Sequence, residues 1–187
     1  MPFRKTEILG VKLFDPSVFE DERGFFYESF KSSGVTSEFG AFAVEQVNNS
    51  MSRRGVIRGI HFKRSPRGQA KFVSVQSGSI YDVAIDLRKS SPTFGKSKGF
   101  LLSALNNQSL LLSKGIGHAF LALEDGSRVN YLCDSHYEPE MEFAINPKTA
   151  GINWDEISLR HGITEFYLSE KDKAAPHFDD SRHLWFD

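Results

Sequence analysis

Residues 79–87 form the most regular run in the chain, Ser79-Ile80-Tyr81-Asp82-Val83-Ala84-Ile85-Asp86-Leu87. In an extended strand the even-numbered residues share one face, which carries Asp82 and Asp86, and the odd-numbered residues share an apolar face. The alternation therefore predicts a strand that packs against a core on one face and lines a polar cavity on the other.

Similar short runs occur along most of the chain, with glycine and proline between them. The clearest of these runs span residues 25–30, 55–62, 71–76, 79–87, 109–112, 118–123 and 128–133. This spacing predicts a mainly β fold, a sandwich or barrel of the jelly-roll kind. Helical patterns are weak except at 31–39, which ends at Gly40, and at 170–175, so we expect short helices there and an irregular tail from about residue 155.

The size and composition are those of one globular domain. The chain has 187 residues, of which 40% are hydrophobic and 25% charged. That length corresponds to about one domain, and this composition lacks the signature of disorder. We expect one domain over 1–187, with a core from about 5 to 176 and a tail at 177–187.

Charge and cysteine content exclude several classes of partner. Lys and Arg number 23 against 24 Asp and Glu, a formal charge of −1, so no global basic field attracts nucleic acid or anionic lipid. The single cysteine, Cys133, excludes an internal disulfide framework. No run approaches the roughly 18 apolar residues of a membrane span. We expect a cytoplasmic protein that binds neither nucleic acid nor membranes.

Two segments contain residues that suit proton chemistry. In residues 54–62, strict alternation places Arg58 and His61 on opposite faces, although the glycines permit a bulge that redirects Arg58. His61 is either an ordinary hydrogen-bonded histidine or a functional one. Lys71 begins an apolar run, where it either faces solvent or serves an anion or oxyanion inside the fold.

The spacing of glycines and histidines resembles the two-part signature of the cupin superfamily. The first part runs from Gly55 through His61 and Lys71 to Gly78, and the second contains Gly115-x-x-His118. Lys63 and Lys71 stand where metal-binding cupins have a histidine and a glutamate. An ammonium group offers no lone pair to a metal. The resemblance implies a cupin barrel with no metal and no other cofactor.

Four stretches resemble one metal-free cupin family, the dTDP-4-dehydrorhamnose 3,5-epimerases. They are residues 19–28, 55–62, 82–95 and 168–172, and the second half of the third reads D-L-R-x-x-S-P-T-F-G. The resemblance covers roughly residues 5 to 176. It implies epimerisation at C3, C5 or both of a dTDP-4-keto-6-deoxyhexose, in deoxysugar biosynthesis.

The resemblance also implies roles for individual residues. His61 matches the family's base, Asp172 its dyad aspartate, Lys71 the lysine beside the sugar and Tyr131 the general acid. Imidazole exchanges protons near neutral pH, and an ammonium group stabilises charge on an enolate oxygen. Nine further positions match substrate-binding residues: Arg23, Glu28, Gln46, Asn48, Arg58, Asp82, His118, Glu142 and Lys171. The family also implies a homodimer that exchanges an amino-terminal strand.

Some positions depart from the common family pattern. Val47 and Ala70 replace an aspartate and a glycine, Ser113 replaces a proline, and residues 144–148 lack the usual tryptophan. These departures resemble the branch that serves specialised deoxysugar pathways, some members of which invert one centre. The sequence therefore leaves open which carbon is inverted. Two rival functions also stay open: a ketoisomerase acting on the same substrates, and a silent cupin that only binds a sugar nucleotide.

Overall fold

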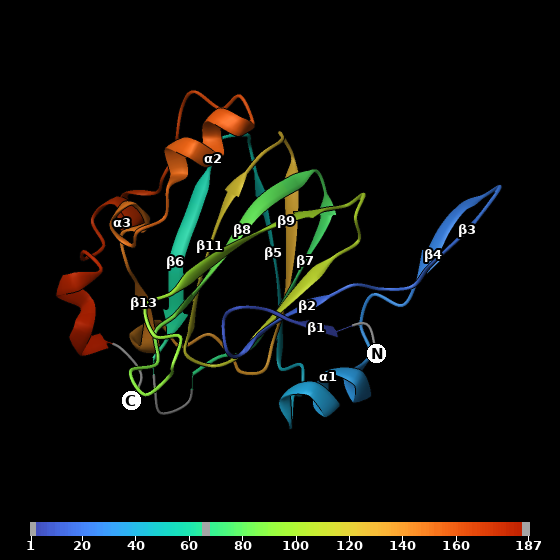
Figure 1. Cartoon of the computed structure of the whole chain (residues 1–187), viewed down its shortest axis with the longest axis horizontal. Helices are drawn as coiled ribbons and strands as arrows, with labels where there is room; N and C mark the ends of the chain where they lie inside the picture. Colours follow the sequence, from blue (N-terminus) through green and yellow to red (C-terminus); the bar gives the residue numbers. More distant parts are fainter. Residues whose placement is uncertain (1–2, 65–67, 185–187) are drawn as a thin grey trace.

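The computed structural model describes residues 3–64 and 68–184, and strands dominate it (Figure 1). The strands are β1 (Phe3–Lys5), β2 (Val11–Phe14), β3 (Val18–Asp21), β4 (Gly24–Tyr27), β5 (Gln46–Ser52), β6 (Ile57–Lys63), β7 (Lys71–Ser77), β8 (Ser79–Asp86), β9 (Ser97–Ser103), β10 (Ser109–Leu112), β11 (Ile116–Ala122), β12 (Ser127–Cys133) and β13 (Glu142–Ala144). The helices are α1 (Ser32–Phe39), α2 (Trp154–Arg160) and α3 (Glu170–Lys173), with 3-10 turns at Pro139–Met141, Pro147–Thr149 and Asp179–Leu184.

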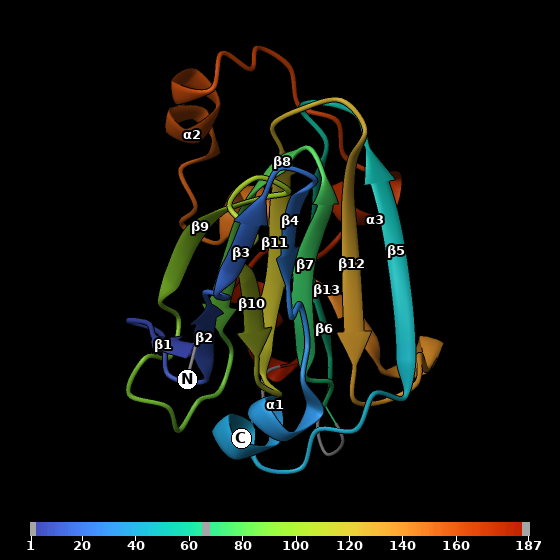
Figure 2. The same cartoon turned by 90° about the vertical axis from the view of Figure 1, so that its right-hand side faces the viewer.

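Two antiparallel sheets face each other and form the body of the fold. One has the order β1-β2-β10-β7-β12-β5 and the other the order β13-β6-β11-β8-β9. Strands β3 and β4 pair only with each other among the described residues, and their hairpin projects away from the sheets (Figure 1). Strand β5 lies at one edge of the larger sheet (Figure 2). The mainly β fold predicted from the sequence is confirmed.

Strand β8 shows how the sequence pattern divides the core. Ile80 and Ala84 face the layer between the sheets, whereas Val83 and Ile85 pack on the outer face with Trp154. The predicted alternation is therefore present. However, Ile80 and Ala84 pack against Val73, so the face that carries Asp82 is partly apolar core as well.

The D-L-R-x-x-S-P-T-F-G run builds a turn around a buried carboxylate. Asp86 is 0% exposed and accepts hydrogen bonds from Arg88 Nε at 2.8 Å, Ser91 Oγ at 2.5 Å and Thr93 Oγ1 at 2.6 Å. Burial opposes ionisation of Asp86, but these donors outweigh it and hold its pKa below the usual value. The motif therefore fixes the loop between β8 and β9.

The helices match the sequence expectations in part. Helix α1 covers the predicted 31–39 segment, buries Val35 and ends at Gly40, whose φ of 79° suits glycine. Helix α3 lies within the predicted 170–175 segment. The expectation of an irregular tail from about residue 155 is wrong, because α2 forms there, with the Asn153 side chain capping the backbone N–H of Glu156. None of the described helices is long and apolar enough to cross a membrane.

Candidate active site

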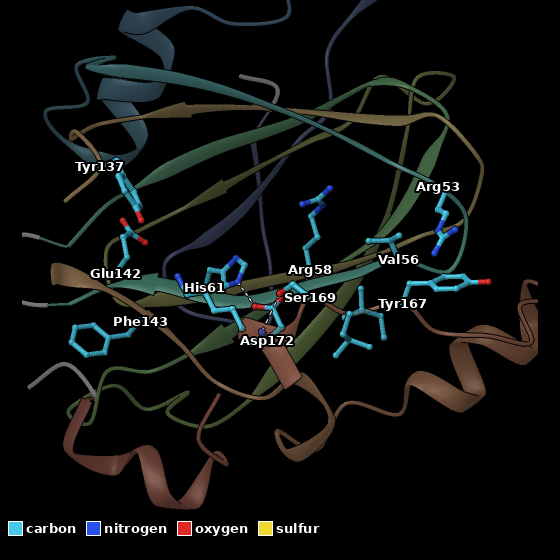
Figure 3. A pocket seen from close by; sticks show the side chains of 13 residues that line it. Arg53, Val56, Arg58, His61, Tyr137, Glu142, Phe143, Tyr167, Ser169 and Asp172 are labelled. Atoms are coloured by element: carbon cyan, nitrogen blue, oxygen red, sulfur yellow. Dashed lines mark hydrogen bonds and ion pairs between the residues drawn. The ribbon is translucent and has the colours of Figure 1, made fainter. Parts of the chain in front are cut away.

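A cavity of about 500 Å³ runs along β6 and is bordered on one side by the segment that leads into α3. Tyr137 and Glu142 lie at one end of the cavity, His61 lies near its middle, and Arg53 and Tyr167 lie at the other end (Figure 3). The complete lining is Arg53, Val56, Ile57, Arg58, His61, Tyr137, Glu142, Phe143, Tyr167, Leu168, Ser169, Lys171 and Asp172.

The cavity contains a histidine–aspartate pair. His61 Nε2 lies 2.7 Å from Asp172 Oδ1, and the side chains are 40% and 4% exposed, respectively (Figure 3). Burial raises the pKa of Asp172, but the hydrogen bond and charge of His61, with donors from Ser169 and the backbone of Gly59, hold that pKa below its usual value. The ionised carboxylate orients the imidazole and leaves Nδ1 as the ring atom that can accept a proton.

A bulge in β6 places Arg58 and His61 beside the same cavity. In the ladder with β11, His61 pairs with His118 and Arg58 pairs with Phe120. Three positions on β6 are therefore matched by two on β11, which is a register shift. Strict alternation, which places these two side chains on opposite faces, is wrong here because of this bulge. Gly59 at the bulge has φ 108°, and a Cβ there would lie 2.4 Å from His118 O, so only glycine fits.

A second histidine–aspartate pair lies deeper, between the sheets. His118 Nε2 lies 2.7 Å from Asp82 Oδ2, and Asp82 is 0% exposed. The other oxygen, Asp82 Oδ1, is buried and has no hydrogen-bond partner among the described residues. Because His118 pairs with His61 in the β-ladder, the two imidazoles belong to adjacent strands.

Tyr131 belongs to the facing sheet, on β12. Its ring meets the ring of His118 edge-on, with centroids 5.9 Å apart, and its Oη lies 3.3 Å from Ser50 Oγ. Burial, with a contribution from the Asp82 carboxylate, raises the pKa of Tyr131 well above its usual value. The phenol therefore keeps its proton at neutral pH.

Three more of the predicted residues share the inner face of the larger sheet. Lys71 is half-buried and lies on the same face of β7 as Val73, the ladder partner of Tyr131. Gln46 and Asn48 lie on the same face of β5, joined by a hydrogen bond of 2.9 Å from Gln46 Nε2 to Asn48 Oδ1. The three residues are not part of the cavity lining, but Gln46 Oε1 accepts a hydrogen bond of 2.7 Å from the backbone N–H of Tyr137, which is part of that lining.

Two of the predicted binding residues, Arg23 and Glu28, lie outside the cavity that contains His61. Arg23 lies in the β3–β4 turn, where its guanidinium pairs with Asp21. Glu28 follows β4, is exposed and lies 3.5 Å from Lys31 Nζ. Because the hairpin projects from the sheets (Figure 1), a single chain does not bring Arg23 or Glu28 to His61.

Several cavity residues were not predicted from the sequence. Arg53 stacks on the Tyr167 ring, with 3.8 Å from its guanidinium carbon to the ring centroid, and Tyr167 O accepts from Ile57 N. Tyr167 forms an isolated β-bridge with Val56, the residue before β6, and no periodic pattern signals this bridge. Among the side chains of residues 3–64 and 68–181, no group of three or more His, Cys, Asp or Glu residues is arranged to hold a metal ion.

The sequence matches the dTDP-4-dehydrorhamnose 3,5-epimerase family over residues 5–180. A dTDP-4-dehydrorhamnose 3,5-epimerase of Mycolicibacterium smegmatis is 41% identical over 177 residues, which are 94% of this chain and 85% of that protein.

Solved structures of similar proteins include two kinds of epimerase. The RmlC epimerase of Mycobacterium tuberculosis matches with a TM-score of 0.91 and 37% identity, covering 100% of this chain and 94% of that one. ChmJ, a 3'-monoepimerase from Streptomyces bikiniensis in complex with dTDP-quinovose, matches with a TM-score of 0.87 and 36% identity, covering 96% and 89%.

Proposed function

The chain belongs to the dTDP-4-dehydrorhamnose 3,5-epimerase family, and on that basis we propose how its own residues perform the reaction. The protein is an isomerase that epimerises a dTDP-4-keto-6-deoxyhexose at C3 and C5 in deoxysugar biosynthesis. The observation that carries the mechanism is the pairing of His61 with Asp172 on one sheet and the position of the half-buried Tyr131, edge-on to His118, on the facing sheet.

Each inversion consists of one proton removed and one proton returned. His61 Nδ1 takes the proton from the carbon next to the C4 ketone, and the C–H electron pair forms the enolate double bond. Negative charge collects on O4, which the Lys71 ammonium group stabilises. Tyr131 then donates its proton to the carbon from the opposite face, so the configuration changes, and solvent restores both groups.

The charged and amide groups around the cavity suit a nucleoside diphosphate. Arg58 donates from Nε to Ser52 Oγ at 3.0 Å and from Nη2 to Met51 O at 3.1 Å, which holds its guanidinium. With Lys171 it offers positive charge to the diphosphate. Gln46 and Asn48 offer amides to the pyrimidine base, beside the exposed Tyr137 ring.

A homodimer accounts for the position of the hairpin. Phe19, Phe25 and Phe26 on β3 and β4 are 56% to 71% exposed, and Val47 and Met51 on the edge strand β5 are 52% and 63% exposed. Aromatic side chains on a projecting hairpin and an unpaired sheet edge are complementary surfaces. We propose that the hairpin of one subunit packs on β5 of its partner and brings Arg23 and Glu28 to the partner's cavity.

We also propose that the enzyme is cytoplasmic and works without a metal ion. Cys133 is a buried free thiol, as expected in a reducing compartment, and Lys63 and Lys71 occupy two cupin ligand positions. Activity that survives exhaustive chelation supports the second proposal. A stoichiometric divalent ion that restores activity would contradict it.

Product analysis separates this function from its rivals. Incubation with dTDP-4-keto-6-deoxyglucose, followed by NMR, is expected to give products that keep the C4 ketone but have inverted stereocentres. A carbonyl moved to C3 would instead identify a ketoisomerase. Unchanged substrate that nevertheless binds would identify a silent sugar-nucleotide-binding cupin.

A further inference from the structure

Lys63, the last residue of β6, is a buried cation with no part in the mechanism above. Its side chain is 0% exposed, although a buried ammonium group is unfavourable unless acceptors surround it. Lys63 therefore cannot touch a substrate in the cavity. Any effect on the reaction must act through the residues that accept its hydrogen bonds.

All three acceptors belong to one short segment, residues 135–138. Lys63 Nζ donates to His136 O at 2.7 Å, to Glu138 Oε1 at 2.9 Å and to Ser135 Oγ at 3.4 Å. The 135–138 segment is also held by Gln69, whose Nε2 donates to the backbone carbonyl of Ser135 at 2.7 Å. The ammonium group thus ties the end of β6 to this segment.

The same segment builds one end of the cavity. Tyr137 lies between two of the anchored residues, is 54% exposed and lines the cavity, and its backbone N–H donates to Gln46 Oε1 at 2.7 Å. Glu142, which lines the cavity too, is the ladder partner of Lys63. One buried side chain therefore anchors the segment whose Tyr137 ring lines the cavity and whose backbone holds the Gln46 amide.

We propose that Lys63 is a positioning residue that holds Tyr137 and Gln46 in the geometry that binds the nucleotide base. The inference rests on the proposed function, because it assigns this end of the cavity to the base of the sugar nucleotide. It differs from the catalytic assignments in acting on binding alone. His61, Asp172 and the α3 segment are anchored by other contacts.

The test compares nucleotide binding with turnover in matched variants. Lys63→Met keeps the unbranched apolar part of the side chain and removes its charge and donors, and Glu138→Gln keeps the shape of the acceptor but removes its charge. Lys98→Gln is the control, since Lys98 makes an ion pair of 2.8 Å with Glu7 away from the cavity. Titration calorimetry with dTDP gives Kd, and NMR turnover gives KM and kcat.

We expect Lys63→Met to raise the Kd for dTDP and the KM by about tenfold or more, with kcat within about threefold of native. Glu138→Gln should raise Kd by about threefold, and Lys98→Gln should leave Kd and kcat unchanged. If Lys63→Met does not fold, as judged by its thermal unfolding, Glu138→Gln together with Ser135→Ala decides the question in the same way.

A Kd for dTDP equal to that of the native enzyme in folded Lys63→Met would overturn the proposal. The same result in both Glu138→Gln and Ser135→Ala would overturn it too. A fall in kcat with unchanged Kd would also overturn it, because it would place Lys63 in the chemistry. These results differ from a failure of the proposed function, in which the native enzyme itself would not bind dTDP or would not turn over the substrate.

Discussion

The imidazole of His61 and the carboxylate of Asp172 lie 2.7 Å apart, although 111 positions separate them in the sequence. The connection depends on Tyr167, whose backbone exchanges hydrogen bonds with the residues that precede and begin β6, Gly55 and Ile57. Ser169 then caps α3 by accepting from Asp172 N at 3.0 Å. The dyad is thus assembled by backbone pairing close to it.

Replacing Asp172 by Asn tests the role of the carboxylate. Asp172→Asn should lower kcat by about 10²-fold, less than His61→Ala, because the base remains but its orientation and the charge that balances the imidazolium are lost. Glu170→Gln, whose carboxylate is 89% exposed on the same helix, is the control and should behave as native. Equal and small losses in Asp172→Asn and His61→Ala would mean that the base is wrongly assigned.

Removing the hydroxyl of Tyr131 should separate exchange from inversion. In Tyr131→Phe, His61 still removes a substrate proton and returns one to the same face, so solvent deuterium enters without epimerisation. Ser50 loses a hydrogen-bond partner, which costs about 1 kcal/mol of stability. Tyr81→Phe, on the outer face of β8, is the control. Epimerisation of Tyr131→Phe at the native rate would exclude Tyr131 as the acid and favour Tyr137.

The carboxylate of Asp86 should control stability and its pH dependence. Asp86→Asn should lower the free energy of unfolding by about 3 kcal/mol at pH 7, because Arg88 loses its buried partner. Since folding lowers the pKa of Asp86, its contribution is complete above the unfolded carboxyl pKa of about 3.9 and is lost as the pH falls through the folded pKa.

The difference between native and Asp86→Asn in urea unfolding should therefore shrink on acidification below about pH 4. The exposed Asp180→Asn is the control and should stay within about 0.5 kcal/mol of native at each pH. A difference that stays constant down to the acid transition would contradict the account of this turn.

Mixing two inactive variants tests the shared site of the proposed dimer. Each cavity would combine His61 of one subunit with Arg23 of its partner, so a hybrid of His61→Ala and Arg23→Ala has one intact site. Random pairing after joint refolding should restore about one quarter of native activity. His61→Ala with Asp172→Asn, both in the same subunit's site, should restore none. If the mixture of His61→Ala and Arg23→Ala is no more active than either variant alone, the proposal of a shared site is contradicted.

Periodic patterns predicted several of the strands, although β2 and β9, which also carry buried apolar residues, lie outside the predicted runs. The 109–112 run matches β10 at both ends, and the 71–76 run matches β7 within one residue. Strand β5 was not predicted because one of its faces is entirely polar and Asn49 interrupts the apolar pair Val47 and Met51 on the other. Pairing with β12 makes it a strand. Helix α2 was also missed, because seven residues are too few for a clear helical period, although Asn153 and Glu156 form a readable capping pattern.

The candidate site came from the family resemblance more than from the patterns. Alternation alone placed Asp82 on an inner face, but it placed Arg58 opposite His61, since a bulge at Gly59 depends on tertiary contacts with β11. The strand pattern around Tyr131 alone predicts an aromatic side chain that packs in the core. No local pattern indicates that Arg23 lies on a hairpin that projects away from the two sheets.

Deuterium incorporation at the two carbons beside the ketone tests the central claim most directly. We predict that native enzyme, incubated with dTDP-4-keto-6-deoxyglucose in deuterium oxide, places deuterium at C3 and at C5, and that His61→Ala places it at neither while still binding dTDP. Deuterium at C3 alone would contradict the inversion of both centres. Exchange in His61→Ala at the native rate, or no exchange by native enzyme with bound substrate, would contradict proton abstraction by His61.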